Sequence, residues 1–181
     1  MLHDIRSKMV KPYVKGDVLD IGCGINLSNY KMSKDEIKDF VGVEYDEEVV
    51  ARLKKKFQKL SFFRRDLDID KLEIKKKFDT ILIVAVIEHI FNQKHLMSEV
   101  AKHLKPKGKI IITTPTPFGN DWVLKYGSAL GLFSSQAGHG DHIVVYNKDR
   151  FRVLANELGL KIETYKTFEF RCNQLVVLSK K

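Results

Sequence analysis

Cysteine is scarce in this chain. The 181 residues include two cysteines, Cys23 and Cys172, which lie far apart in the sequence. Two isolated cysteines cannot form the framework of a disulfide-rich domain, and they lack the paired spacing of a zinc site. Cys23 lies between two glycines, where a small side chain fits. We therefore expect it to serve packing rather than redox chemistry.

Long hydrophobic runs are also absent. No apolar stretch approaches the roughly 20 residues that a membrane-spanning helix requires. The first residues, Met-Leu-His-Asp-Ile-Arg-Ser-Lys, lack the apolar core of a signal peptide. These absences predict a cytoplasmic protein with no membrane span. The proportions of hydrophobic residues (44%) and charged residues (30%) are typical of a globular protein, and the length favours a single domain over residues 1–181.

Arginine-rich segments with interleaved aromatic residues are missing, although the net charge is +9. A basic surface can attract nucleic acid or anionic lipid. Here the lysines gather in short clusters at expected helix ends and turns, at Lys54–Lys56, Lys75–Lys77 and Lys105–Lys109. A small-molecule partner is therefore favoured over nucleic acid, which stays an alternative. The oligomeric state is not indicated.

Segments with strand and helix patterns alternate along the chain. An N-terminal helix is expected within residues 1–15, ended by Pro12, and residues 105–108 are expected to form a turn. Strands are expected at residues 17–21, 40–44, 61–65, 78–85, 109–114, 161–168 and 173–178, and further helices at 26–32, 47–60, 93–104 and 148–158. This order predicts an α/β fold: a doubly wound, mostly parallel seven-stranded Rossmann-like sheet, with helices on both faces and an antiparallel C-terminal strand.

The first expected strand stops at two glycines. Val18, Leu19 and Ile21 form its apolar run, and Gly22 and Gly24 follow. Because glycine has no Cβ, the backbone can adopt positive φ there and a ligand can lie against the main chain. Such a strand–loop–helix unit is the usual cradle for the nucleotide part of a cofactor.

Carboxylates follow the next two expected strands. Glu44 lies twenty residues after Gly24, the spacing at which a carboxylate can bind both ribose hydroxyls of a nucleoside. The alternative is a solvated residue at a strand end. Asp66 follows the third strand, where it can accept a hydrogen bond from an adenine amino group. The alternative for Asp66 is a turn or helix-capping residue.

These motifs together resemble a known family. Val-Leu-Asp-Ile-Gly-Cys-Gly is followed in order by Val-Gly-Val-Glu, Arg-Asp-Leu, Phe-Asp-Thr-Ile-Leu-Ile-Val-Ala-Val-Ile-Glu-His and Leu-Lys-Pro-Lys-Gly-Lys-Ile-Ile-Ile. The chain resembles class I S-adenosylmethionine-dependent methyltransferases of type 11, which include the ubiquinone and menaquinone biosynthesis methyltransferases. The resemblance covers residues 16–115 and implies the cofactor but not the methyl acceptor.

The resemblance also implies roles by position. Asp20, Gly22 and Gly24 would hold the methionine end of S-adenosylmethionine. Glu44 would bind the ribose and Asp66 the adenine, and Val84 and Ala85 would form the wall beside the sulfonium. The remaining residues of the cofactor site would be Cys23, Asn26, Tyr45 and Leu67. Asn26 stands where the family often has a third glycine. Because Asn tolerates left-handed conformations, the turn is expected to survive.

Methyl transfer to a hydroxyl or an acidic carbon benefits from a base. The candidates are Glu88 and His89 after the fourth strand, and His139, Asp141 and His142 farther on. A structural role for Glu88 and His89 is the alternative. Some relatives bind a divalent metal through Glu-x-x-Glu-His, but Ala85 replaces the first Glu here. Two ligands remain, and we therefore expect no metal site; the alternative is that His139 or His142 completes one.

Residues 115–142 form a connection too long for a plain turn. The segment is rich in both apolar residues and glycine, so we expect a lid that shapes the acceptor pocket and includes a helix at 121–132. The alternative is that its side chains pack on the sheet. An apolar lid favours a small apolar or aromatic acceptor.

Three other functions stay open at this point. The enzyme could instead methylate RNA or protein, or the chain could be a non-catalytic module that binds S-adenosylmethionine. A nicotinamide-dependent oxidoreductase is a further alternative, but Leu27 stands at the third glycine position of that fingerprint.

Overall fold

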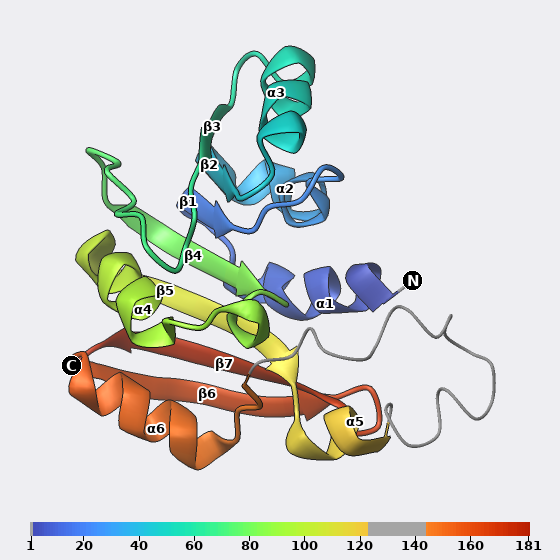
Figure 1. Cartoon of the computed structure of the whole chain (residues 1–181), viewed down its shortest axis with the longest axis vertical. Coiled ribbons are helices and arrows are strands. Elements are labelled where there is room, and N and C mark those ends of the chain that lie inside the picture. The colour runs from blue at the N-terminus through green and yellow to red at the C-terminus, as the bar shows by residue number, and fades with distance from the viewer. Residues whose placement is uncertain (1, 123–143) are drawn as a thin grey trace.

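The computed structural model of the chain describes residues 2–122 and 144–181. Its strands form one sheet of seven, in the order β3-β2-β1-β4-β5-β7-β6 (Figure 1). The strands are β1 (Gly16–Ile21), β2 (Ile37–Glu44), β3 (Ser61–Arg64), β4 (Phe78–Val84), β5 (Leu104–Pro115), β6 (Leu160–Phe168) and β7 (Asn173–Lys180). The first five strands pair in parallel, and β7 is antiparallel to both of its neighbours. The predicted α/β sheet is confirmed.

Helices cover both faces of this sheet. They are α1 (Leu2–Val10), α2 (Ser28–Ser33), α3 (Glu47–Lys56), α4 (Gln93–Lys102), α5 (Pro117–Trp122) and α6 (Lys148–Glu157). Short 3-10 turns occur at Lys11–Tyr13, Lys34–Glu36 and Ile87–His89. None of the helices in the described residues is long and apolar enough to cross a membrane.

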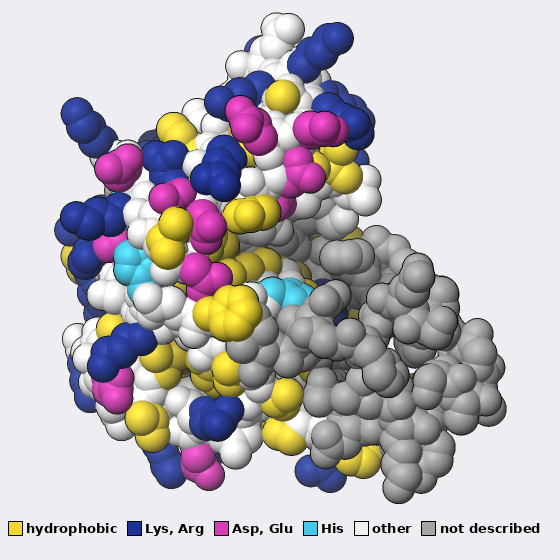
Figure 2. Space-filling view, viewed as in Figure 1, with side chains coloured by type: hydrophobic (Ala, Val, Ile, Leu, Met, Phe, Trp, Pro, Cys, Tyr) yellow, Lys and Arg dark blue, Asp and Glu magenta, His cyan; other side chains and the backbone are white. Residues whose placement is uncertain are grey.

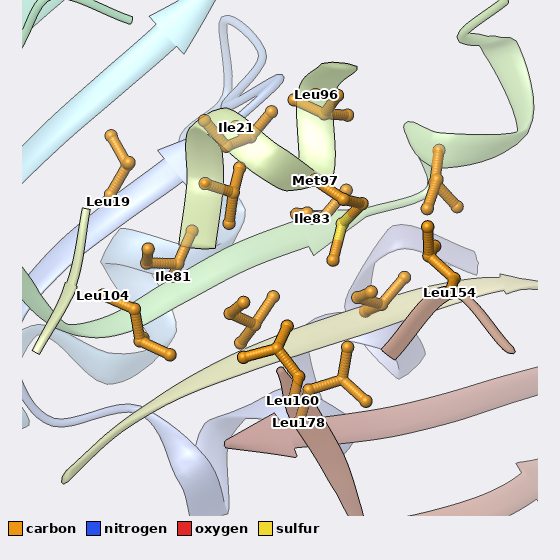
Figure 3. Packing of buried hydrophobic residues seen from close by; sticks show 14 of the residues in the cluster. Leu19, Ile21, Ile81, Ile83, Leu96, Met97, Leu104, Leu154, Leu160 and Leu178 are labelled. Atoms are coloured by element: carbon orange, nitrogen blue, oxygen red, sulfur yellow. The ribbon is translucent and has the colours of Figure 1, made fainter. Parts of the chain in front are cut away.

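Two apolar cores lie on opposite faces because successive strand residues point to opposite sides of a sheet. On one face, Leu96 and Met97 of α4 and Leu154 of α6 pack over alternate residues of β1, β4, β5 and β7 (Figure 3). On the other face, Val10 of α1 and Leu53 of α3 pack with the intervening strand residues. The strands are thus covered on both sides, as their continuous apolar runs predict.

Chain order reverses between β1 and β4. From β1 the chain runs outward through β2 and β3, then returns to place β4 on the other side of β1. In open α/β sheets, ligands bind beyond the carboxyl ends of the strands at such a point. The fold therefore brings the loops after β1, β2 and β4 together.

The prediction of a turn at residues 105–108 was wrong, because these residues belong to β5. Phe78 of β4 pairs with Leu104, and Thr80 pairs with Lys109, so an irregularity in the ladder takes up the intervening residues. Pro106 has no N–H to donate to a regular ladder. The strand therefore begins before the irregularity and continues after it.

Other helices and strands begin or end a few residues away from the positions that the sequence predicted. The helix expected at 47–60 ends at Lys56, and Phe57 leaves the helical region with φ −124°. The strand expected at 40–44 begins at Ile37, where it pairs with Gly16 of β1. The helix expected at 26–32 begins at Ser28, because Leu27 adopts a left-handed conformation. A left-handed residue cannot lie within a right-handed helix.

The long connection after β5 is described in part. Thr116 Oγ1 accepts a hydrogen bond from Gly119 N at 2.9 Å and donates one to Arg171 O at 2.6 Å, which fixes the start of α5 against the β6–β7 turn. This helix begins before the predicted residue 121. The remainder of the predicted helix and most of the predicted lid lie outside the described residues.

Candidate cofactor-binding site

The glycine loop after β1 needs both of its glycines, for different reasons. Gly22 has φ +67°, and a Cβ on it would clash with Val86 Cγ2. Gly24 has φ +62°, but a Cβ there would meet open space. Gly22 is thus required by both conformation and packing, whereas Gly24 is required by conformation alone.

Backbone bonds anchor this loop to the neighbouring strand. Val43 O of β2 accepts hydrogen bonds from Gly22 N at 2.8 Å and from Cys23 N at 3.1 Å. The left-handed residue that follows is Leu27, with φ +47°, rather than Asn26. The interpretation that the turn would use the tolerance of Asn26 was therefore wrong. Leu27 is fully buried, and burial of its side chain offsets the strain of this conformation.

Glu44 at the end of β2 spans the glycine loop. Its Oε2 accepts a hydrogen bond from Gly24 N at 3.0 Å, and its Oε1 accepts one from Tyr45 N at 2.8 Å. The twenty-residue spacing seen in the sequence thus corresponds to direct contact. Each carboxylate oxygen has further acceptor capacity, so the ribose role of Glu44 stays a prediction.

A pocket of about 470 Å³ opens at this edge of the sheet. It lies at the carboxyl ends of β1, β2 and β4 and against the segment that follows β3. Its lining residues are Gly22, Glu44, Tyr45, Asp66, Leu67, Asp68, Ala85, Val86, His89 and Ile90.

The pocket is acidic in an otherwise basic protein. Three carboxylates line it, from Glu44, Asp66 and Asp68, and no lysine or arginine of residues 2–122 and 144–181 does. Outside the pocket lining, acidic side chains on the upper part of the face in Figure 2 are interspersed with lysine and arginine. A cleft lined by one sign of charge concentrates ligands of the opposite sign. The pocket therefore favours a ligand that carries positive charge.

In the segment after β3, aspartates hold the backbone in place through hydrogen bonds to one another. Asp66 Oδ1 accepts a hydrogen bond from Asp68 N at 3.1 Å, and Asp66 N donates to Asp70 Oδ2 at 2.7 Å. Asp68 Oδ1 in turn accepts a hydrogen bond from Asn92 N at 2.6 Å. Asp66 is thus a turn residue, as the alternative interpretation held, and it also lines the pocket.

Asp20 lies beneath the pocket rather than in its lining. Its side chain is fully buried, and Asn29 Nδ2 donates to both carboxylate oxygens, at 3.2 and 3.1 Å. Burial raises the pKa of Asp20 to about 7, and the charge of Glu44 contributes in the same direction, while the Asn29 hydrogen bond opposes the rise. Asp20 is therefore a carboxyl group whose charge depends on its immediate surroundings near neutral pH.

Cys23 packs inside the loop. Its Sγ lies 2.7 Å from the position that a Cβ on Gly42 would take, so Gly42 makes room for the thiol. Burial raises the pKa of this thiol, and the nearby Asp20 and Glu44 charges add to the effect. A thiol held in its neutral form is a poor nucleophile, in keeping with a packing role.

Ala85 follows β4 in a strained conformation. Its φ is +55°, and its N–H donates to Thr113 O at 2.9 Å. Strain of this kind at a residue other than glycine often marks a functional position. Ala85 lines the pocket, whereas Val84 packs into the core on the α1 side of the sheet.

Glu88 and His89 diverge within their 3-10 turn. His89 lines the pocket, whereas Glu88 is buried outside it. Glu88 Oε2 has no hydrogen-bond partner among the described residues. The other base candidates, His139, Asp141 and His142, lie outside the described residues. Within the described part of the chain, no group of three or more His, Cys, Asp or Glu side chains converges on a metal-binding arrangement.

Most of the predicted cofactor residues thus come together, but not all of them reach the pocket. Five predicted cofactor residues, Asp20, Cys23, Gly24, Asn26 and Val84, do not line it, and neither does the base candidate Glu88. The sequence analysis missed Asp68, Val86 and Ile90, which do. The signal for all three was their place one to six residues beyond a strand that ends at the site.

The chain matches the model of a methyltransferase domain family over residues 2–165. It belongs to that family. The resemblance to class I S-adenosylmethionine-dependent methyltransferases is confirmed.

Individual relatives are distant. Over 153 residues the chain is 26% identical to the malonyl-[acyl-carrier protein] O-methyltransferase 2 of Ilyobacter polytropus, covering 78% of this chain and 56% of that protein. Over 111 residues it is 27% identical to the ubiquinone biosynthesis O-methyltransferase of Rickettsia conorii, covering 60% of this chain and 38% of the relative. The chain therefore spans about two fifths to a little over half the length of these relatives.

Solved structures share the fold over nearly the whole chain. The magnesium protoporphyrin IX methyltransferase of Synechocystis, with bound S-adenosylhomocysteine, has a TM-score of 0.74 at 18% identity and covers 99% of this chain and 84% of its own. The methyltransferase partner of the activator Trm112 from Haloferax volcanii has a TM-score of 0.74 at 16% identity, covering 98% and 88%. At such identities the likeness shows the fold alone.

Proposed function

We propose that the chain transfers a methyl group from S-adenosylmethionine to a small apolar or aromatic acceptor. The observation that carries the proposal is the contact between Glu44 and the glycine loop at the rim of an acidic pocket. The contact supports the proposal because it holds the Glu44 carboxylate, the predicted ribose ligand, beside a main chain that a ligand can approach closely.

The residues present fit this cofactor. Gly24 has open space where a side chain would otherwise lie. The pocket volume, about 470 Å³, lies within the range of small-molecule sites. Its three carboxylates complement a sulfonium cation. The fit thus combines shape, size and charge.

Distinct residues would hold the parts of the cofactor. Glu44 would bind the ribose, Asp66 and Leu67 the adenine, and Ala85 would adjoin the sulfonium. The bound cofactor would supply an electrophilic methyl group attached to a good leaving group. The protein then has to hold the acceptor in line and keep water away from the reacting atoms.

Val86 and Ile90, with Leu67 and Ala85, provide the apolar part of the pocket wall, which suits the exclusion of water. His89 lies on the same wall and is the described residue best placed to accept a proton from an acceptor. His139 and His142 stay candidates for the same role. Glu88 is the weaker candidate because its side chain is buried outside the pocket.

The acceptor proposal draws on the apolar content of residues 115–142 and on the relatives' names, which include an O-methyltransferase of ubiquinone biosynthesis. RNA or protein acceptors and a non-catalytic binding module are the competing possibilities. One relative is named a tRNA U34 carboxymethyltransferase, so RNA belongs in any acceptor screen.

The test has two stages. Calorimetric titration with S-adenosylmethionine, S-adenosylhomocysteine and NADH first measures cofactor choice, and binding of NADH alone would contradict the proposal. A screen with methyl-labelled cofactor against phenols, quinols, acyl esters, RNA and protein then identifies the acceptor. Cofactor binding without label transfer to any of them would favour the non-catalytic module.

A further inference from the structure

A buried hydrogen-bonded chain connects helix α1 to Asp20. Ser7 Oγ of α1 donates to Asn29 Oδ1 of α2 at 2.9 Å, and Asn29 Nδ2 donates to the Asp20 carboxylate. The three residues come from separate elements, and their exposed fractions are 2%, 7% and 0%. Three polar side chains are thus sequestered together where β1 ends.

The direction of the bonds matters. Because Ser7 donates to the amide oxygen of Asn29, the amide NH₂ group is left facing Asp20. The opposite orientation would aim a carbonyl oxygen at a carboxylate, which is unfavourable while the carboxylate is charged. Ser7 therefore selects the Asn29 orientation that stabilises ionised Asp20.

We propose that Ser7 and Asn29 are positioning residues that hold the buried Asp20 carboxylate beside the glycine loop, from where it favours the ammonium group of the cofactor's amino-acid tail electrostatically and without contact, which makes α1 part of the support of the cofactor site. The inference rests on the proposed function, in which Asp20 belongs to the methionine end. The inference adds Ser7 and Asn29, which lie outside the glycine loop, to the predicted cofactor site, and it gives the N-terminal helix a role.

The placement of α1 is consistent with this role. Figure 1 shows α1 and α2 beside the end of the sheet where β4 terminates. Arg6, next to Ser7, donates from Nη2 to Asn173 Oδ1 at 3.0 Å. Of these two adjacent residues of α1, Ser7 contacts α2, and Arg6 contacts the start of β7. Helix α1 is thus held at this edge of the sheet by two separate elements.

The charged surroundings of Asp20 make the Asn29 contact important. Glu44 at the end of β2 repels the Asp20 charge, and the Cys23 thiol in the loop is neutral. Arg6 on α1 is engaged with Asn173. Of the described contacts, Asn29 supplies the hydrogen bond that favours ionised Asp20.

The experiment compares two ligands over a range of pH. S-adenosylhomocysteine carries the amino-acid tail, and 5′-methylthioadenosine lacks it. Dissociation constants for both are measured by calorimetry from pH 6 to pH 8.5 in the wild type, Ser7→Ala, Asn29→Leu and Ser7→Thr. Lys8→Ala is the matched control, because Lys8 is an exposed residue of the same helix.

We expect Ser7→Ala and Asn29→Leu to weaken S-adenosylhomocysteine binding by about tenfold at neutral pH, since hydrogen bonds to charged groups have effects of this size. The loss should shrink at pH 8.5, where the higher pH itself favours ionised Asp20, and 5′-methylthioadenosine binding should not change. Ser7→Thr keeps the hydroxyl and should bind like the wild type.

Equal weakening for both ligands at every pH would show that the chain of bonds merely stabilises the fold, and would overturn the inference. So would unchanged binding in Ser7→Ala. Thermal melting of each variant identifies loss of fold, and Ser7→Cys replaces Ser7→Ala if the latter unfolds. Failure of the wild type to bind S-adenosylhomocysteine would instead overturn the proposed function itself.

Discussion

Gly22 and Val86 touch across the floor of the pocket, so that a single added methyl group on Gly22 would overlap Val86 Cγ2. The two residues belong to the loops after β1 and β4, the strands between which chain order reverses. Their contact brings the glycine loop against the turn that carries His89. The cofactor loop and the candidate base are thereby packed as one unit.

Gly22→Ala should therefore impair both folding and binding. The substitution forces alanine into positive φ and displaces Val86, so we expect a loss of about 2–3 kcal/mol in the free energy of unfolding. S-adenosylhomocysteine binding should fall at least tenfold. Urea denaturation and calorimetry measure the two effects.

Gly24→Ala is the matched control for that substitution. Gly24 shares the positive φ but has open space around its Cα, so only the conformational cost of about 1 kcal/mol is expected. If the two variants were equally destabilised, the contact with Val86 would not be the cause.

Glu44→Gln should separate binding from stability. The amide oxygen can still accept one of the two backbone hydrogen bonds that Glu44 receives, from Gly24 and Tyr45, so the free energy of unfolding should fall by no more than about 1 kcal/mol. Cofactor affinity should fall at least tenfold because the charge and one ribose acceptor are lost. Glu48→Gln, on exposed α3, is the control and should bind normally. Normal affinity in Glu44→Gln would contradict the ribose role.

Asp20 should make the stability of the ligand-free protein fall as pH rises. Its pKa is raised from 3.8 to about 7 in the folded protein, so the folded state holds the proton more tightly than the unfolded chain. The resulting stabilisation is complete below pH 3.8 and is lost as pH rises through about 7. Linkage limits its size to at most about 4 kcal/mol.

The variant Asp20→Asn isolates this effect because asparagine does not titrate. The free energy of unfolding of Asp20→Asn minus that of the wild type should increase from pH 4 to pH 7 and then level off. Urea denaturation at several pH values measures the difference. A difference independent of pH would show that Asp20 has an ordinary pKa.

The sequence predicted the fold well because its strand signals were local and strong. The run from Ile81 to Val84 is apolar throughout, and the structure places its strand, β4, at the centre of the sheet. The helices and strands whose observed bounds differ from the predicted ones had weaker local signals in the sequence. Leu27 in a left-handed conformation has no sequence signature, since burial of its side chain in the assembled core stabilises it.

The site was predicted in part for a similar reason. Residues such as Glu44 and Asp66 follow strands directly, and parallel strands bring their carboxyl ends to one edge. The link from Ser7 through Asn29 to Asp20 joins three distant segments. Neither hydrophobic periodicity nor motif spacing carries information about such a contact, so the sequence could not reveal it.

His89→Ala should lower turnover while preserving cofactor binding. If His89 accepts a proton from the acceptor, kcat should fall about a hundredfold or more, with little change in the dissociation constant for S-adenosylhomocysteine. The measurement requires an acceptor from the labelled screen. Unchanged kcat would exclude His89 as the base and would leave the role to His139 or His142, which the double alanine variant tests.

Lys105→Met should affect acid stability but not cofactor binding. Lys105 Nζ lies 2.7 Å from Asp17 Oδ2 and 2.7 Å from Asp79 Oδ2, at the amino ends of β1 and β4, opposite the pocket. Its hydrogen bonds lower the pKa of both aspartates.

A lowered pKa in the folded state contributes stability above pH 3.8 that is lost as pH falls further. Because Lys105→Met removes this contribution, the variant should be less stable than the wild type at neutral pH, and the difference should narrow as pH falls below 3.8. Lys107→Met, an exposed neighbour, is the control. A change in S-adenosylhomocysteine affinity in Lys105→Met would show that the two ends of the sheet are coupled, contrary to this expectation.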